Sequence, residues 1–289
     1  MNGILVVNKP KNYTSRDIVN IIGEYLGTKK IGHTGTLDPI AKGVLVLCIG
    51  SSLKLVEILT NHDKEYIAEL IIGYETDTLD ITGTKLNEKK IDNLTKEKVI
   101  EVLNKYTGEI IQEVPKYSAI KVKGKKLYEY ARNNIEVDLP KRKVKIYDIK
   151  LLSDIEKDKD NNYIFTIKCK VSKGTYIRSL IRDIGISLGS YATMKNLIRT
   201  KLGNFNIDEA YTIENIKNNN YKLINPLDIL PFEKVVVDKN IEKKIKNGMV
   251  LDKFFNSDIA TIVNNNNELL AIYKVKDNDN TKVKPWKMF

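Results

Sequence analysis

Residues 32–50, GHTGTLDPIAKGVLVLCIG, decide how the rest of this chain is interpreted. The first half is rich in Gly and Thr and predicts a loop, because these residues interrupt regular hydrophobic periodicity. The second half, from residue 43 onward, is a continuous apolar run that is typical of a buried strand. The stretch therefore places a polar loop directly against the core of the protein.

The loop carries one carboxylate among residues that shape the backbone. Gly32 and Gly35 allow a tight backbone that can approach a ligand closely, and Thr36 adds a hydroxyl group. Pro39 fixes the chain directly after Asp38. Two interpretations follow: Asp38 points into a cleft as a reactive group, or it stabilises a turn by accepting hydrogen bonds from backbone N–H groups. Local physics alone favours the turn.

The segments next to this loop predict a strand, a helix and a second strand. Residues 3–8, GILVVN, have the pattern of a buried strand. A helix follows, with Thr14 or Ser15 as its N-cap and Gly27 at its end. Residues 64–76, KEYIAELIIGYET, again have the pattern of a long strand.

The middle of the chain mixes strands and helices without a regular order. Residues 75–92 are polar and predict a loop, and Thr95 is the expected cap of the next helix. Two strands at 142–155 and 161–172 are joined by a charged turn, and an amphipathic helix is expected over 176–189. Because βαβ regularity is missing, the sequence predicts an α+β fold with a mixed sheet.

A change of pattern near residue 231 divides the chain. The segment 224–234, INPLDILPFEK, carries two prolines, and the pieces KVVVD, IATIV and ELLAIYKV beyond it resemble short strands. This tail is too short for another α/β layer and suits a small β-barrel. The sequence thus predicts one domain over 1–230 and a second over 231–289.

The charge of the chain is strongly basic. A formal net charge of +11 and a pI of about 9.3 favour a polyanionic partner such as a nucleic acid. The alternative is a solvated basic surface without such a partner. Charge alone does not decide between them.

Several other classes of protein find no support in the sequence. No run of about 18 apolar residues predicts a membrane span, and the start MNGILVVNKPKNY lacks the pattern of a secretory signal, so we expect a cytoplasmic protein. Cys48 and Cys169 lie in apolar segments and predict reduced core thiols. There is no GxGxxG, Walker A or HExxH motif, so we expect neither a cofactor nor a metal.

At this point the loop is seen to resemble a known catalytic motif. GHTGTLDPIAKGVLVLCIG is similar to that of the tRNA pseudouridine synthase B (TruB) family, and the tail resembles a small RNA-binding domain of the PUA kind. Six motifs in the family's order are not expected by chance. The five others are VVNKP at 6–10, DKEYIAEL at 63–70, YSAIKVKGKKLYEYAR at 117–132, SKGTYIRSLIRDIG at 172–185 and LIRTKLGNF at 197–205.

The resemblance implies a fold, a reaction and a partner. The fold would be that of pseudouridine synthases, a mixed and largely antiparallel sheet flanked by helices, with a small β-barrel-like domain of the PUA type at the C-terminus. The reaction would be the isomerisation of uridine to pseudouridine in the T-loop of tRNA, at the position conventionally numbered 55, with the target base flipped out. The partner would be the T-arm of tRNA, bound by a monomer without cofactor, guide RNA or membrane.

The resemblance also implies roles for individual residues. Asp38 matches the catalytic aspartate, either as nucleophile at the sugar or as the base that removes a sugar proton. Burial alone disfavours a charged carboxylate, so a cation is expected beside it, and Arg178 is the matching candidate. Tyr66 matches a tyrosine that stacks on the uracil, and Tyr176 is expected in the same pocket. Leu197 matches an apolar position that packs against the base.

Two further residues match the family and also have simpler interpretations. His33 matches a histidine that occupies the space left by the extruded base; otherwise it is a loop histidine bonded to its own backbone. Lys9 matches a basic residue near the active site; otherwise it is a solvated turn lysine. By pattern alone, Arg178 would be a surface residue of an amphipathic helix, while Tyr66 and Leu197 would be core.

Three functions therefore remain to be separated. The leading one is a stand-alone tRNA pseudouridine synthase. The second is a non-catalytic RNA-binding or RNA-chaperone protein, which would not need Asp38, Tyr66 and Arg178 in combination. The third is a guide-RNA-dependent synthase, against which the short tail argues.

Overall fold

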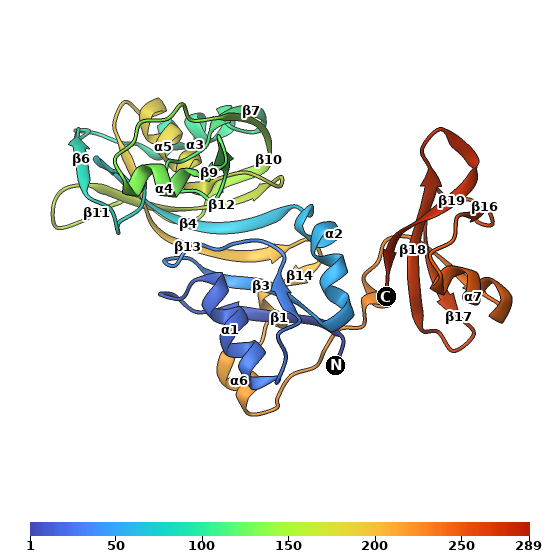
Figure 1. The fold of residues 1–289 in the computed structure, drawn as a ribbon. Helices are drawn as coiled ribbons and strands as arrows, with labels where there is room; N and C mark the ends of the chain where they lie inside the picture. The colour runs from blue at the N-terminus through green and yellow to red at the C-terminus, as the bar shows by residue number, and fades with distance from the viewer.

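The computed structural model describes residues 1–289 as two bodies of unequal size (Figure 1). The larger body is built on a ten-stranded sheet, and the smaller one is a curled five-stranded sheet at the C-terminal end. An extended segment connects them. No helix is long and apolar enough to cross a membrane.

The large sheet is mixed, as the sequence predicted. Every pair of neighbours along its main path is antiparallel except β3 and β13, which run parallel. Its path is β1 (Gly3–Lys9), β3 (Lys42–Ile49), β13 (Ala192–Leu202), β4 (Lys64–Ile72), β12 (Tyr163–Val171), β10 (Lys141–Leu151) and β7 (Gly108–Glu113). Three short strands pair beside this path: β2 (Ile31–His33), β11 (Glu156–Lys157) and β14 (Phe205–Asn206).

The parallel contact between β3 and β13 requires a glycine. Gly43 lies opposite Arg199 and has a φ of +106°. A Cβ at this position would approach the Arg199 carbonyl oxygen to 2.3 Å, so a side chain would separate the strands. This close contact joins the two halves of the sheet immediately after the GHTGTLDP loop.

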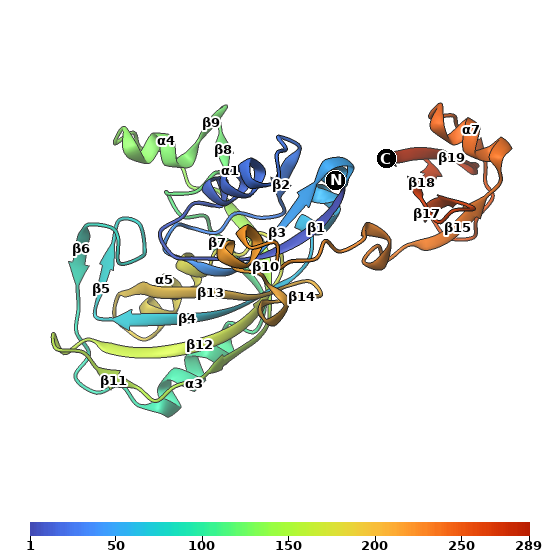
Figure 2. The same ribbon diagram turned by 90° about the horizontal axis from the view of Figure 1, so that it is seen from below.

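Helices cover both halves of the sheet. Helix α1 (Ser15–Tyr25) begins as expected, because Thr14 and Asp17 form a reciprocal capping box. It packs on β1 and β3 through Ile18 and Ile22. The other half is covered by α3 (Lys96–Lys105) and α5 (Ile177–Ser187), whose apolar faces share one core with β4, β12 and β10 (Figure 2). The remaining helical segments are η1 (Gly50–Leu55), α2 (Val56–Thr60), α4 (Leu127–Arg132), η2 (Ile207–Glu209), α6 (Ile213–Lys217) and η3 (Pro226–Asp228).

Some elements differ from the sequence-based prediction. The polar stretch 75–92 is not only a loop, because β5 (Tyr74–Thr76) and β6 (Lys85–Glu88) form a hairpin there. Its polar composition concealed the pairing, since all residues of β6 are exposed. The sequence analysis also missed β7 and β13. The segment 117–132 contains β8 (Lys121–Val122), β9 (Lys125–Lys126) and α4.

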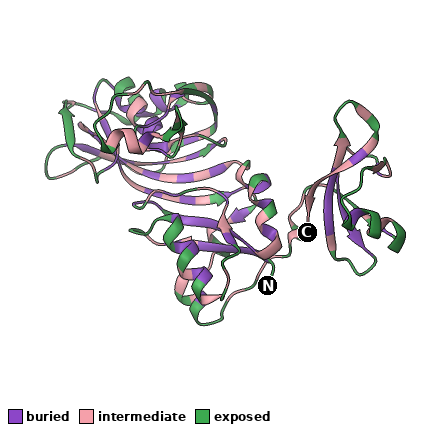
Figure 3. Cartoon of the chain, in the orientation of Figure 1, coloured by how far each residue is buried: buried purple, intermediate pink, exposed green.

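The C-terminal sheet confirms the predicted β-rich tail and adds one helix that the sequence analysis missed. Burial follows the strands of this sheet in Figure 3, and a cluster of nine buried residues forms its core. The sheet contacts the large body: Lys287 pairs with Glu57 at 2.6 Å, and Ile272 belongs to one core cluster with Ile4 and Val46 of the large sheet. Its elements are β15 (Glu233–Val237), α7 (Lys239–Lys246), β16 (Leu251–Asp252), β17 (Ile259–Asn264), β18 (Leu269–Lys276) and β19 (Asp279–Met288).

Both cysteines are buried and free, as expected for core thiols. Burial raises the pKa of Cys48 and of Cys169 to about 12, so both thiols stay protonated at neutral pH.

Candidate active site

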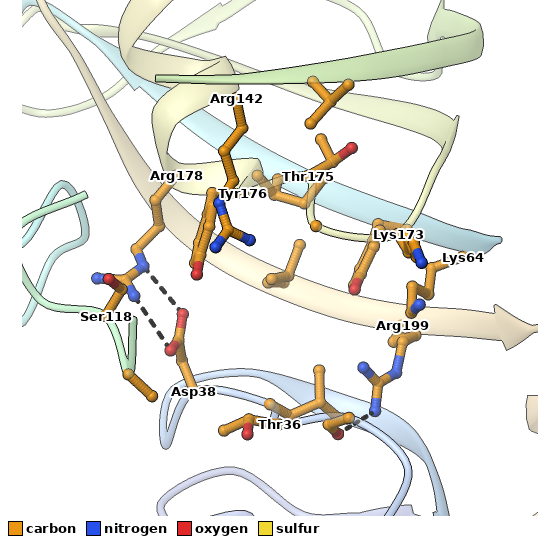
Figure 4. A pocket seen from close by; sticks show the side chains of 18 of the residues that line it. Thr36, Asp38, Lys64, Ser118, Arg142, Lys173, Thr175, Tyr176, Arg178 and Arg199 are labelled. Atoms are coloured by element: carbon orange, nitrogen blue, oxygen red, sulfur yellow. Dashed lines mark hydrogen bonds and ion pairs between the residues drawn. The ribbon is translucent and has the colours of Figure 1, made fainter. Parts of the chain in front are cut away.

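A cavity of about 830 Å³ opens beside the loop that carries Asp38. Its wall combines that loop with parts of β4, β10 and β13, the segment 117–119 and the start of α5 (Figure 4). Asp38 is the only acidic residue in the wall. The basic residues in the wall are Lys64, Arg142, Lys143, Lys173, Arg178 and Arg199.

Asp38 and Arg178 form a two-point ion pair across the cavity wall (Figure 4). The Nε of Arg178 lies 2.9 Å from Oδ2 of Asp38, and its Nη2 donates to Oδ1 at 3.1 Å. One hydrogen bond and one close ion-pair contact, to the two different carboxylate oxygens, fix the direction of the carboxylate as well as its charge. The sequence separation of the two residues is 140, so only the fold brings them together.

Backbone groups hold the other side of the Arg178 guanidinium. Nη1 donates to the carbonyl of Thr78 at 2.9 Å, and Nη2 also donates to the carbonyl of Tyr117 at 3.0 Å. A second buried carboxylate, Asp80, lies 3.9 Å from Nη1. Arg178 is only 5% exposed, so the interpretation of this residue as a surface arginine is wrong.

Two side chains from other elements fix the backbone of the loop. Ser15 accepts a hydrogen bond from the Leu37 N–H at 2.8 Å through its buried hydroxyl. Arg199, 1% exposed, donates to the carbonyl of Gly35 at 3.1 Å. Because these bonds run to backbone groups, they leave the Asp38 side chain free to face the cavity.

Lys9 lies behind the loop and outside the cavity wall. Its Nζ donates to the carbonyls of Tyr13 at 2.6 Å, Pro10 at 2.9 Å and Pro39 at 3.4 Å. Burial lowers the pKa of Lys9 from 10.5 to about 8, and the charge of Asp38 opposes this effect. The alternative of a solvated turn lysine is therefore wrong, because the side chain is buried.

Tyr66, Tyr176 and Leu197 all reach the cavity wall, as the resemblance implied. Tyr66 and Leu197 also belong to the core that underlies the cavity. Burial raises the pKa of the Tyr66 phenol, and the nearby Arg199 lowers it in part. Burial likewise raises the pKa of Tyr176. Both phenols therefore stay protonated at neutral pH.

The loop-shaping residues divide into two groups. Gly35 and Thr36 line the cavity. Gly32 and His33 do not; they lie in β2, where they pair with Cys48 and Leu47. The Nδ1 of His33 accepts a hydrogen bond from the Gly35 N–H at 3.3 Å, and burial lowers its pKa. The hydrogen bond expected for a loop histidine bonded to nearby backbone is thus present. The other role, in which His33 occupies the space left by the extruded base, stays a prediction.

Gln112 is a buried residue near the cavity that the sequence analysis missed. Its side chain lies in the edge strand β7, is 1% exposed, and holds both backbone groups of Tyr176. The Tyr176 N–H donates to Oε1 at 2.8 Å, and Nε2 donates to the Tyr176 carbonyl at 3.1 Å. The amide therefore acts as a strand partner for the residue that precedes α5. A Gln at an exposed-looking edge strand gives no signal of such a contact.

Replacing Gln112 by Leu is expected to destabilise the protein. Leu has a similar size but leaves the backbone N–H of Tyr176 unpaired, which costs about 1–3 kcal/mol, while the Tyr176 carbonyl keeps the bond from the Leu180 N–H at 3.0 Å. Chemical denaturation of both proteins measures this difference. Gln112→Glu is the matched variant, because its protonated carboxyl keeps an acceptor for the Tyr176 N–H and a donor for the carbonyl, so it should lose less at low pH than at neutral pH. A Leu variant as stable as the wild type would show that the contact contributes nothing.

No group of three or more His, Cys, Asp or Glu side chains is placed to hold a metal ion. The chemistry that the wall offers is that of one oriented carboxylate, two protonated phenols and several cations. Four further residues support this arrangement, although no local motif singled them out: Asp80, Arg199, Ser15 and Gln112.

Comparisons with known sequences identify the relatives of the chain. Residues 24–177 match the TruB family pseudouridylate synthase N-terminal domain, and 178–236 match the tRNA pseudouridylate synthase B C-terminal domain. The protein named tRNA pseudouridine synthase B from Clostridium tetani is 44% identical over 271 residues, which cover 91% of this chain and 92% of that protein. The protein of the same name from Halalkalibacterium halodurans is 42% identical over 298 residues, covering 100% and 97%.

Solved structures share the fold. An H/ACA RNP bound to a substrate RNA containing 2′-deoxyuridine has a chain with a TM-score of 0.71 and 23% identity, covering 99% of this chain and 84% of that one. The archaeal box H/ACA sRNP Nop10-Cbf5 complex gives a TM-score of 0.69 at 23% identity, covering 99% and 85%.

The mixed sheet, the Asp–Arg cavity and the matched domains define a pseudouridine synthase. Within that class, the chain belongs to the TruB family of pseudouridylate synthases.

Proposed function

We propose that this enzyme converts uridine 55 in the T-loop of tRNA to pseudouridine, with Asp38 as the reactive carboxylate. The observation that carries the proposal is the two-point hold of Arg178 on Asp38 in the wall of a basic cavity. A cavity of about 830 Å³ is large enough for an extruded nucleotide. The names of the bacterial relatives support tRNA as the substrate.

The reaction makes modest chemical demands. The C1′–N1 bond breaks, the uracil turns, and C1′ joins C5; the proton that leaves C5 is balanced by one taken up at N1. No atom or electron is gained or lost overall. The site must therefore supply a carboxylate that attacks the sugar or removes a sugar proton, room for the base to turn, and a route for protons.

The other residues of the wall fit these demands. Tyr66 supplies a ring that stacks on the uracil and a protonated phenol for proton exchange. Tyr176 and Leu197 give apolar contacts that keep the base in place after it leaves its sugar. Outside the wall, His33 of β2 fills the space that the base vacates in the RNA, which offsets part of the cost of unstacking.

The whole chain contributes to binding. We propose that domain 1–230 carries the chemistry and that domain 231–289, of the PUA type, binds RNA through its basic surface. The enzyme acts as a monomer on the folded shape of the T-arm, without guide RNA. With bacterial tRNA as its substrate, its place is the cytoplasm.

Turnover of unmodified tRNA tests the proposal. Purified protein is incubated with a tRNA transcript, and each position is mapped for pseudouridine. We expect modification at position 55 alone, and none in a transcript that carries cytidine there. Binding without any modification would support the RNA-binding alternative instead.

The state of Lys9 predicts the pH dependence of activity. Its pKa in the folded protein, about 8, is depressed below 10.5, so the folded protein loses this proton first as the pH rises. A neutral amine has two donors for three carbonyls, and the 3.4 Å bond to Pro39 is the weakest. We expect the rate of the chemical step to fall as the pH rises through about 8.

The effect of rising pH on the stability of the protein has the opposite sign to its effect on the rate. Between about pH 8 and 10.5 the unfolded chain still holds the proton that folded Lys9 has released, so the contribution of Lys9 to stability rises with pH. Burial also lowers the pKa of Lys64 to about 8, so the rate profile is compared in Lys64→Met and in Lys9→Met. A fall that persists unchanged in Lys9→Met would contradict the assignment to Lys9.

A further inference from the structure

One cation in the cavity wall has no partner in the protein. Arg178 binds Asp38, and the Arg199 guanidinium donates to the carbonyls of Gly35 and Val44. The guanidinium of Arg142 makes no hydrogen bond and no ion pair. The lysines in the wall are all engaged: Lys64 with the carbonyls of Thr60 and His62, Lys143 with Glu109, and Lys173 with Asn61.

The position of Arg142 is set by the edge of the sheet. Arg142 lies in β10 directly opposite Gln112 of β7. Figure 4 shows its guanidinium beside the Tyr176 ring and facing the cavity. Gly174 lies close to this guanidinium, because a Cβ on Gly174 would stand 3.9 Å from Nη1 of Arg142. Arg142 is exposed to solvent, and its guanidinium presents five N–H donors at the cavity wall.

We propose that Arg142 binds a backbone phosphate next to the target nucleotide, as a subsite of the cavity that is separate from the Asp38–Arg178 pair. This proposal rests on the proposed function, because it assumes that an RNA strand enters the cavity. A guanidinium matches the two oxygens of a phosphate with parallel N–H bonds. Asp38, the only carboxylate in the wall, is already held by Arg178, so no protein anion competes.

The consequence for catalysis is positional. A phosphate held at Arg142 fixes the RNA backbone beside Tyr176. Arg178, two residues after Tyr176 in the protein, fixes Asp38. The RNA strand is then held by Arg142 of β10 and the carboxylate by Arg178 of α5. Arg142 is thereby a binding residue and takes no part in breaking the glycosidic bond.

The test uses T-arm hairpins with one neutral linkage. A methylphosphonate replaces the phosphate either on the 5′ or on the 3′ side of the target uridine, and binding is measured at several salt concentrations. Arg142→Ala is expected to weaken binding about 10-fold or more and to reduce the slope of log K against log salt by about 1. In the wild type, one of the two methylphosphonates should cause a similar loss, and Arg142→Ala should be insensitive to that same substitution.

Two variants sharpen the comparison. Arg142→Lys keeps the charge but loses the paired donors, so its salt slope should stay near that of the wild type while its affinity falls. Lys150→Ala removes one charge from the same strand, outside the cavity wall, and should bind the hairpin like the wild type.

Three results would overturn the assignment. The first is wild-type affinity of Arg142→Ala for the unmodified hairpin. The second is an equal loss in wild type and Arg142→Ala on both methylphosphonates. The third is an unchanged affinity and salt slope with a slower chemical step, which would mean contact with the base instead. The first two results are read from binding alone, whereas the proposed function fails only if the wild type forms no pseudouridine, so the two failures are distinguishable.

Discussion

Asp38→Asn is expected to reduce pseudouridine formation to the uncatalysed background. The amide keeps the size of the side chain and one carbonyl oxygen, but it is neither a nucleophile nor a base at neutral pH. Folding should persist, because the loop backbone is held by Ser15, Arg199 and Lys9 and not by the carboxylate. The measurement is the single-turnover rate on tRNA at saturating enzyme, with thermal melting and RNA binding measured on the same samples.

This substitution also separates the two interpretations of the loop. If Asp38 only stabilised a turn, Asn would serve nearly as well, since Asn is itself favoured in turns. RNA affinity should change little, because the electrostatic attraction is spread over many basic side chains. Near-normal turnover by a folded Asp38→Asn variant would remove Asp38 from the chemistry.

Arg178→Lys is expected to lower the single-turnover rate by about 100-fold, because a displaced carboxylate loses its alignment with the sugar. The guanidinium contacts four acceptor oxygens: it donates hydrogen bonds to Oδ1 of Asp38 and to the carbonyls of Thr78 and Tyr117, and its Nε lies 2.9 Å from Oδ2 of Asp38. A lysine has three donors on one atom and cannot reach all four acceptors. Stability should also fall, since removing one partner of a buried pair leaves polar groups unpaired.

A matched control lies one turn further along the same helix. Arg182 pairs with Glu113 and Asp183 and lies outside the cavity wall. Arg182→Lys should therefore leave the rate unchanged. Equal rates for Arg178→Lys and the wild type would mean that Asp38 does not depend on a two-point hold.

The loop and its neighbours were within reach of sequence reasoning. The apolar run of β3, the capping residues of α1 and the amphipathic α5 all have local signals, and the structure has each of them. The placement of Arg178 had no such signal. Its helix is amphipathic, so its pattern suggested solvent, and only the family resemblance connected it to Asp38. A contact across 140 residues depends on the sheet that joins them.

The missed side chains share one physical cause, which is that their partners are backbone groups far away in sequence. Arg199 and Gln112 each bond to carbonyls or N–H groups of another segment, and no residue pattern encodes such a partner. β13 was missed for another reason: two register shifts, at Met194/Asn196 and at Arg199/Lys201, interrupt the alternation of its sequence, ATMKNLIRTKL.

Pseudouridine mapping tests most directly whether this protein alone modifies position 55. The mixture contains purified protein, T-arm hairpin, monovalent salt and EDTA, with no other RNA. The prediction is complete conversion of the uridine that corresponds to position 55, and of no other uridine. Conversion that appears only when zinc or a guide RNA is added, or that falls on a different uridine, would contradict the account.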